Sequence, residues 1–80
     1  MDVAIHTMSQ KVYEGRAREV ILPGEDGDLS VLDFHQPCVY SLTRGRITVI
    51  PADRGAAYGL EITRGIANIR PDALTLLVEP

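Results

Sequence analysis

The chain has 80 residues, of which 45% are hydrophobic, and a formal net charge of −3, so we expect residues 1–80 to form one domain with a thin core. The net negative charge and the scattered arginines argue against nucleic acid as the main ligand, because phosphate binding needs clustered basic side chains. We expect no membrane-spanning segment and no secretion signal, because no apolar run has the required length or flanks. The single cysteine, Cys38, excludes an intrachain disulfide and a cysteine-based zinc site.

Hydrophobic residues alternate with polar ones along much of the chain, which is typical of strands that bury one face. From the N-terminus, the segments with this period are 3–8, 46–50, 58–63 and 74–78. Turn signals rich in Gly, Pro and Asp separate them, and no helical periodicity is sustained. We therefore predict an all-β fold, a flattened antiparallel β-sandwich or barrel of about eight to ten short strands with no C-terminal helical hairpin.

The most informative segment runs from residue 19 to residue 40 and reads EVILPGEDGDLSVLDFHQPCVY. A strand-like run ends at Pro23-Gly24, an acidic turn follows at 25–28, and Phe34-His35 precedes Pro37. This order resembles the "PG…GE.GVLPGHAP" signature of the epsilon subunit of the rotary ATP synthase, with His35 and Pro37 at its His and last Pro. Further fragments that resemble the family, in the same order as in its members, are Tyr13-Glu14-Gly15, Leu42-Thr43-Arg44-Gly45, Gly65-Ile66 and Leu74-Thr75-Leu76-Leu77.

The resemblance implies a non-catalytic rotor subunit of the ATP synthase central stalk, which links the gamma shaft to the membrane c-ring and couples ion translocation to ATP synthesis. It implies the gamma subunit and the c-ring as partners and no cofactor or metal. It also implies a peripheral location at the cytoplasmic face of the energy-coupling membrane, with membrane contact only through the complex. Some family members bind ATP through residues that involve a helical domain, so we carry over no nucleotide site.

By the same resemblance, one end of the sandwich rests on polar loops of the c-ring. The candidate ring contacts are Asp28, Leu29, Phe34 and His35. One strand face is expected to pack on gamma, but the sequence does not identify its residues. A face that normally lies against a partner predicts weak self-association when the chain is alone.

The chain departs from the family pattern at several positions. Asp33-Phe34 stands where the signature has Pro-Gly, which predicts a different loop shape between residues 33 and 37, and Ser30 stands where the family has Gly. Typical members continue into a two-helix domain beyond the position of Pro80. Without those helices, we expect this chain not to inhibit ATP hydrolysis by the catalytic head.

Other interpretations of these residues stay open. Glu25 and Asp26 also fit a solvated hairpin loop, since Asp and Gly supply turn chemistry. Cys38 is expected to be a small buried hydrophobic residue; a catalytic thiol would need a base nearby, and His35 is expected to face the opposite side of an extended chain. The second functional class is a small free-standing β-module that binds a protein or peptide by strand addition.

Overall fold

The computed structural model describes all residues from 1 to 80, and it contains strands, turns and bends but no helix. The predicted all-β fold is confirmed, although β2, with 14 residues, is not short. No helix is present that is long and apolar enough to cross a membrane. In chain order, the strands are β1 (Asp2–His6), β2 (Lys11–Gly24), β3 (Gly27–Leu32), β4 (Cys38–Leu42), β5 (Gly45–Pro51), β6 (Tyr58–Ile62), β7 (Arg64–Arg70) and β8 (Ala73–Glu79).

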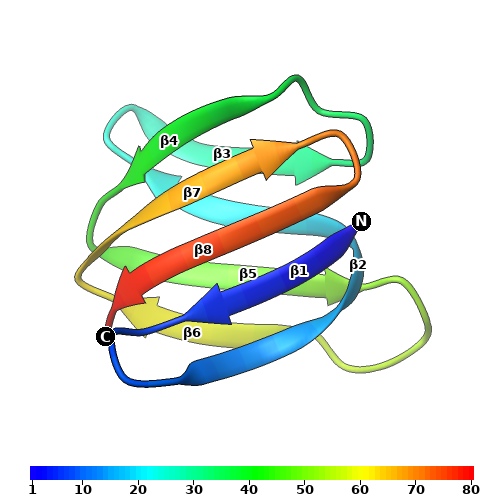
Figure 1. Cartoon of the computed structure of the whole chain (residues 1–80), viewed down its shortest axis with the longest axis horizontal. Coiled ribbons are helices and arrows are strands. Elements are labelled where there is room, and N and C mark those ends of the chain that lie inside the picture. Colours follow the sequence, from blue (N-terminus) through cyan, green and yellow to red (C-terminus); the bar gives the residue numbers. More distant parts are fainter.

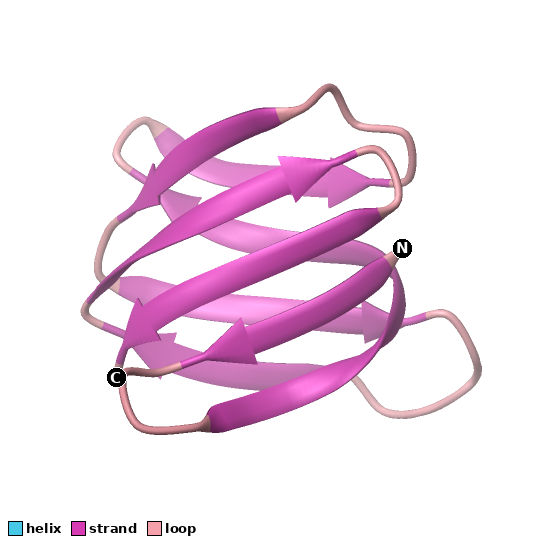
Figure 2. Ribbon diagram, viewed as in Figure 1, coloured by secondary structure: helices cyan, strands magenta, loops and turns pink.

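Two packed layers share the long strand β2 (Figures 1 and 2). The first part of β2 pairs with β1, and the second part pairs with both β3 and β5. The pairing register with β5 shifts between Ala17 and Glu19, as expected of a bulge that bends a strand. Sheet A therefore consists of β4, β7, β8, β1 and the first part of β2, and sheet B of β3, the second part of β2, β5 and β6.

One strand pair departs from the predicted antiparallel sandwich. β1 and β8 run parallel, with Val3 opposite Leu74 and Ile5 opposite Leu76, whereas the other paired strands are antiparallel. The prediction is wrong for this pair because the whole intervening chain connects the two strands, so no local turn dictates their relative direction. Alternation of period two reports which face is buried and carries no information about direction.

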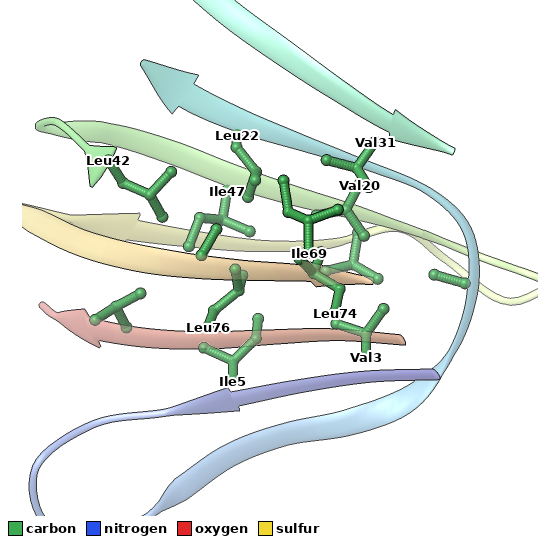
Figure 3. Close-up of a cluster of buried hydrophobic side chains, with 14 of the residues drawn as sticks. Val3, Ile5, Val20, Leu22, Val31, Leu42, Ile47, Ile69, Leu74 and Leu76 are labelled. Atoms are coloured by element: carbon green, nitrogen blue, oxygen red, sulfur yellow. The ribbon is translucent and has the colours of Figure 1, made fainter. Parts of the chain in front are cut away.

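The core lies between the two sheets and is built from alternate residues of the strands (Figure 3). No polar or charged side chain is buried. Burying one large aliphatic side chain stabilises a fold by about 1.5–3 kcal/mol, so this layer supplies most of the driving force for folding. The largest fully buried side chains are Ile5, Leu22, Ile47, Ile69, Leu74 and Leu76.

Three strands are paired on one side only, namely β3, β4 and β6. β3 and β4 belong to different sheets and lie along the same side of the sandwich, at the top of Figure 1. The β2–β3 hairpin and the loop 33–37, which joins β3 to β4, lie at opposite ends of β3. This side of the molecule therefore carries all of the sequence-predicted ring contacts.

Candidate partner-binding surfaces

The β2–β3 hairpin has a two-residue loop, Glu25-Asp26, between the paired residues Gly24 and Gly27. Among these residues, only Gly27 has a positive φ, 114°. This φ is strongly disfavoured for a residue with a side chain, so glycine completes the chain reversal. The interpretation of Glu25 and Asp26 as an exposed hairpin loop is confirmed.

Asp28 and Leu29 follow the hairpin at the start of β3. Asp28 is exposed and its carboxylate takes part in no ion pair. Leu29 is half-buried, pairs with Leu22 and packs against the core, so it has less free surface than the sequence suggested. The candidate residues therefore differ in how much they can offer to a partner.

The structure does not bring the ring candidates together in one cluster. Asp28 and Leu29 lie at the hairpin end of β3, whereas Phe34 and His35 lie in the loop 33–37 at its other end. A strand rises by about 3.3 Å per residue, so roughly 13 Å of strand separates Asp28 from Leu32 alone. The candidates are spread along one exposed edge of sheet B, which we call the β3 edge: Asp28, Leu29, Phe34 and His35.

Contacts distant in sequence hold the loop 33–37 in place. The Phe34 N–H donates to the carbonyl oxygen of Pro71, in the β7–β8 turn, at 2.6 Å. The α-ammonium group of Met1 donates to Asp33 Oδ1 at 2.6 Å and to the carbonyl oxygen of Ala17 at 2.8 Å. The Met1 partner in this ion pair is only 1% exposed. The loop is thus anchored to sheet A and to the bend of β2.

Phe34 has a left-handed backbone conformation, with φ at 65°, and its side chain is 85% exposed. This conformation costs an L-residue about 1–2 kcal/mol, which glycine avoids. The family signature has glycine at this position, the residue that adopts a positive φ at least cost, and the predicted change of loop shape stays a prediction. The phenyl ring lies outside the hydrophobic core, so burial within this chain does not offset the cost.

His35 is half-buried, and its Nδ1 lies 2.9 Å from the carbonyl oxygen of the neighbouring Gln36. No group of three or more His, Cys, Asp or Glu side chains lies close enough together to hold a metal ion. Contact of His35 with a partner stays a prediction.

Cys38, the first residue of β4, is exposed. The expectation that it is a buried hydrophobic residue is wrong. It pairs with Ile69 at the end of an edge strand, where no further strand covers it. On the same face of β4, Leu42 is buried and Tyr40 is half-buried, so burial decreases toward the Cys38 end of the strand.

The outer face of sheet A carries an apolar hollow, of about 410 Å³, that the sequence analysis did not identify. Ile66 and Leu77 are paired across β7 and β8 and are 51% and 48% exposed, and Met8, in the β1–β2 turn, is 87% exposed. The unbroken apolar run Leu76-Leu77-Val78 was the available signal, because its middle residue must face outward. We call this surface the sheet A groove; its lining includes Met8, Ser41, Ile66 and Leu77.

Charged residues border the sheet A groove at one end. Arg64 and Glu79 form an exposed ion pair across β7 and β8 and also line the hollow. The hydrogen bond to Glu79, together with its charge, raises the pKa of Arg64, and the hydrogen bond from Arg64 lowers the pKa of the Glu79 carboxyl. An apolar centre with a charged rim is the usual composition of a protein interface.

Comparison with protein families gives a match over the whole chain. The family model for the ATP synthase delta/epsilon chain, β-sandwich domain, matches residues 1–80. An ATP synthase epsilon chain from Bordetella avium is 29% identical over 77 residues, which are 96% of this chain and 54% of that protein. Another, from Paracoccus denitrificans, is 42% identical over 62 residues, 78% of this chain and 41% of that protein. The chain thus spans about half the length of the curated relatives it matches.

Solved structures share the fold. A chain in the central stalk and c-ring of the Tetrahymena thermophila mitochondrial ATP synthase superposes with a TM-score of 0.82 at 13% identity, over 100% of this chain and 63% of that chain. A chain of the Euglena gracilis mitochondrial ATP synthase gives a TM-score of 0.84 at 15% identity, over 98% and 49%. At these identities the likeness establishes the β-sandwich architecture.

Proposed function

We propose that this chain, which belongs to the family of ATP synthase delta/epsilon chain β-sandwich domains, links the gamma shaft to the c-ring as part of a central-stalk rotor subunit. The observation that carries the proposal is the family match over residues 1–80. Relatives that are named ATP synthase epsilon chain support it. In this role the subunit couples ion translocation to ATP synthesis without catalytic residues or a cofactor, at the cytoplasmic face of the energy-coupling membrane.

A torque-transmitting element needs a stiff body with two separate contact surfaces. The wholly apolar core and the strand β2, which runs through both sheets, favour stiffness because neither layer can slide without breaking β2 pairing. The β3 edge and the sheet A groove are separate surfaces on this body. The chain therefore has two surfaces, one available to each of two partners.

The β3 edge is the surface that we assign to the c-ring. Asp28 has a free, exposed carboxylate at one end of this edge, and His35 contributes a half-buried imidazole at the other. Groups of this kind can pair with basic or amide groups on polar loops. Exposed pairs contribute about 0.2–1 kcal/mol each, so they orient the subunit more than they set its affinity.

The sheet A groove is the surface that we assign to the gamma shaft. Its exposed Met8, Ile66 and Leu77 supply the apolar area that a lasting interface needs. A groove that is covered in the complex is exposed in the isolated chain, and it is the surface through which we expect weak self-association. Gamma binding should therefore depend on Ile66 and Leu77 and not on Asp28.

The proposal is tested by capture of partners with the tagged chain from detergent-solubilised membranes of the source organism, read by mass spectrometry. We expect recovery of gamma together with alpha, beta and c subunits. Recovery of none of them by a bait shown to be folded would overturn the proposal.

The charge-reversing variant Asp28→Lys tests the assignment of the β3 edge. Replacing attraction by repulsion at an exposed pair should lower c-ring recovery and ATP-driven proton pumping by about two- to fivefold. Asp53→Lys, in the loop between β5 and β6, makes the same change of net charge away from this edge and should leave both unchanged. Wild-type pumping by Asp28→Lys membranes would remove the basis for the Asp28 contact.

A small β-module that binds a peptide by strand addition is the second candidate. The unpaired outer sides of β3, β4 and β6 favour it, because each offers free backbone groups to an added strand. Chemical shift changes confined to one edge on adding a peptide, without recovery of rotor subunits, would select this function instead.

A further inference from the structure

The strand β4 (Cys38–Leu42) forms one edge of sheet A, at the top of Figure 1, and it pairs only with β7. Its outer side therefore has backbone groups without a strand partner. Cys38 is exposed, and the side chain of Val39 is 71% exposed. An edge strand with exposed apolar side chains is a template for pairing with a strand of another chain.

Charge distinguishes β4 from the other two strands that are paired on one side only. β3 carries Asp28 and β6 carries Glu61, whereas every residue of β4 is uncharged. Charged side chains protect an edge against pairing, and like charges brought opposite each other oppose it further. Because each copy of the chain has a net charge of −3, two copies repel each other least at an edge without carboxylates. Among these edges, β4 is therefore the one that best accepts a second copy.

The strand β4 can pair with itself in the antiparallel direction. A twofold axis at Tyr40 places Cys38 opposite Leu42 of the second copy and Val39 opposite Ser41 of the second copy, so that all five residues are paired. An axis at another residue would leave part of the strand unpaired. A twofold dimer uses the same patch on both copies, which a strand paired antiparallel with itself satisfies.

This register also covers the exposed apolar residues of β4. On the inner face, Cys38 would lie beside Leu42 of the second copy, a residue of the hydrophobic core. On the outer face, Val39 would lie beside Ser41 of the second copy, which pairs with Ile66 and lines the sheet A groove. Each copy would thus add an apolar side chain to the border of the other copy's groove, the surface through which we expect weak self-association.

We propose that the free chain forms a twofold homodimer in which β4 pairs antiparallel with β4 of a second copy, centred on Tyr40. The sheets A of the two copies then continue into one sheet. The inference goes beyond the proposed function and does not depend on it, because it concerns the pairing of the chain with itself.

The first test measures the association of the whole chain by sedimentation equilibrium over a range of concentrations. We expect a monomer–dimer equilibrium. Val39→Lys should raise the dissociation constant of the dimer by about tenfold or more, because it places two ammonium groups close to the twofold axis. Val39 is exposed in the single chain, so this variant should fold, which far-UV circular dichroism checks. Ala57→Lys makes the same change of charge at an exposed position before β6 and should leave the dissociation constant unchanged.

Two results of this experiment would overturn the inference. A chain that stays monomeric at every concentration would leave the β4 edge to strand addition by another peptide. A dimer that Leu77→Lys dissociates and Val39→Lys does not would assign self-association to the sheet A groove alone.

The second test determines the register. Two chains, both with Cys38→Ser, carry Val39→Cys in one and Ser41→Cys in the other, and are mixed in equal amounts with glutathione disulfide. Opposite residues have Cα atoms about 4.5–5.5 Å apart, within the reach of a disulfide, so the mixture should yield a covalent dimer of the two different chains. Either chain alone should yield little, because identical positions lie diagonally, about 7–8 Å apart. A mixture without this covalent dimer would overturn the pairing centred on Tyr40.

Discussion

The two ends of β3 solve the same geometrical problem in opposite ways. At the β2–β3 hairpin, the positive φ falls on Gly27, a residue without a side chain. In the loop 33–37, the positive φ falls on Phe34, and groups from Pro71 and Met1 hold the conformation. The hairpin therefore places its positive φ on a glycine, whereas the loop 33–37 places it on a residue with a side chain and is held by contacts distant in sequence.

Among the substitutions that test this comparison, Gly27→Ala is expected to change the free energy of unfolding most. The added Cβ meets open space, so any loss of stability comes from the backbone, whose φ of 114° disfavours a side chain. We expect the free energy of unfolding to fall by about 2–3 kcal/mol, measured by urea denaturation. Asp26→Ala, in the same turn at negative φ, should change it little; equal losses in both variants would show that the hairpin is not controlled by Gly27.

A smaller effect is expected from Asp33→Ala at the other end of the strand. The change removes one of the two acceptors of the Met1 ammonium group, which is nearly inaccessible to solvent. Leaving a buried donor with fewer partners should cost about 1–2 kcal/mol. Amide hydrogen exchange should also accelerate at Phe34 and His35 and stay unchanged in the hairpin. Unchanged exchange in the loop would mean that the Pro71 contact alone holds it.

The smallest effect is expected at the ion pair Arg64–Glu79, which is exposed on both sides and so contrasts with the Asp33 pair. The pKa of Glu79 is lowered in the folded state, mainly by its hydrogen bond from Arg64. A carboxyl with a lowered folded pKa contributes stability above its unfolded pKa and loses it as the pH falls through the folded pKa. The stability difference between the wild type and Glu79→Gln should therefore be small at pH 7 and vanish in strong acid. A difference that grows on acidification would contradict this sign.

Local chemistry explains which features could be predicted. Strand segments such as 46–50 and 74–78 were predicted because alternation reports burial directly, and the hairpin was predicted because Asp26-Gly27 carries its turn chemistry in sequence. The exposure of Cys38 and the inward packing of Leu29 were not predicted. Both depend on where a strand starts relative to its neighbours, which adjacent residues do not specify.

The two candidate surfaces also differ in how far the sequence could predict them. The residues of the β3 edge were identified from the ordered signature in segment 19–40, but their separation toward opposite ends of β3 became visible only in the fold. The sheet A groove was missed because Met8, Ile66 and Leu77 come from distant segments that only pairing of β7 with β8 and the path of the β1–β2 turn bring together.

By itself, the sequence determined the all-β class, the buried face of most strands, the position of the acidic hairpin and the family to which the chain belongs. These follow from side-chain periodicity and turn chemistry, which act over a few residues. Only the tertiary structure decided the parallel pairing of β1 with β8, the division of β2 between two sheets, and the contacts that hold Phe34 in a strained, exposed conformation. These depend on pairings between residues far apart in the chain, whose closure is driven by burial of the common core and leaves no local pattern.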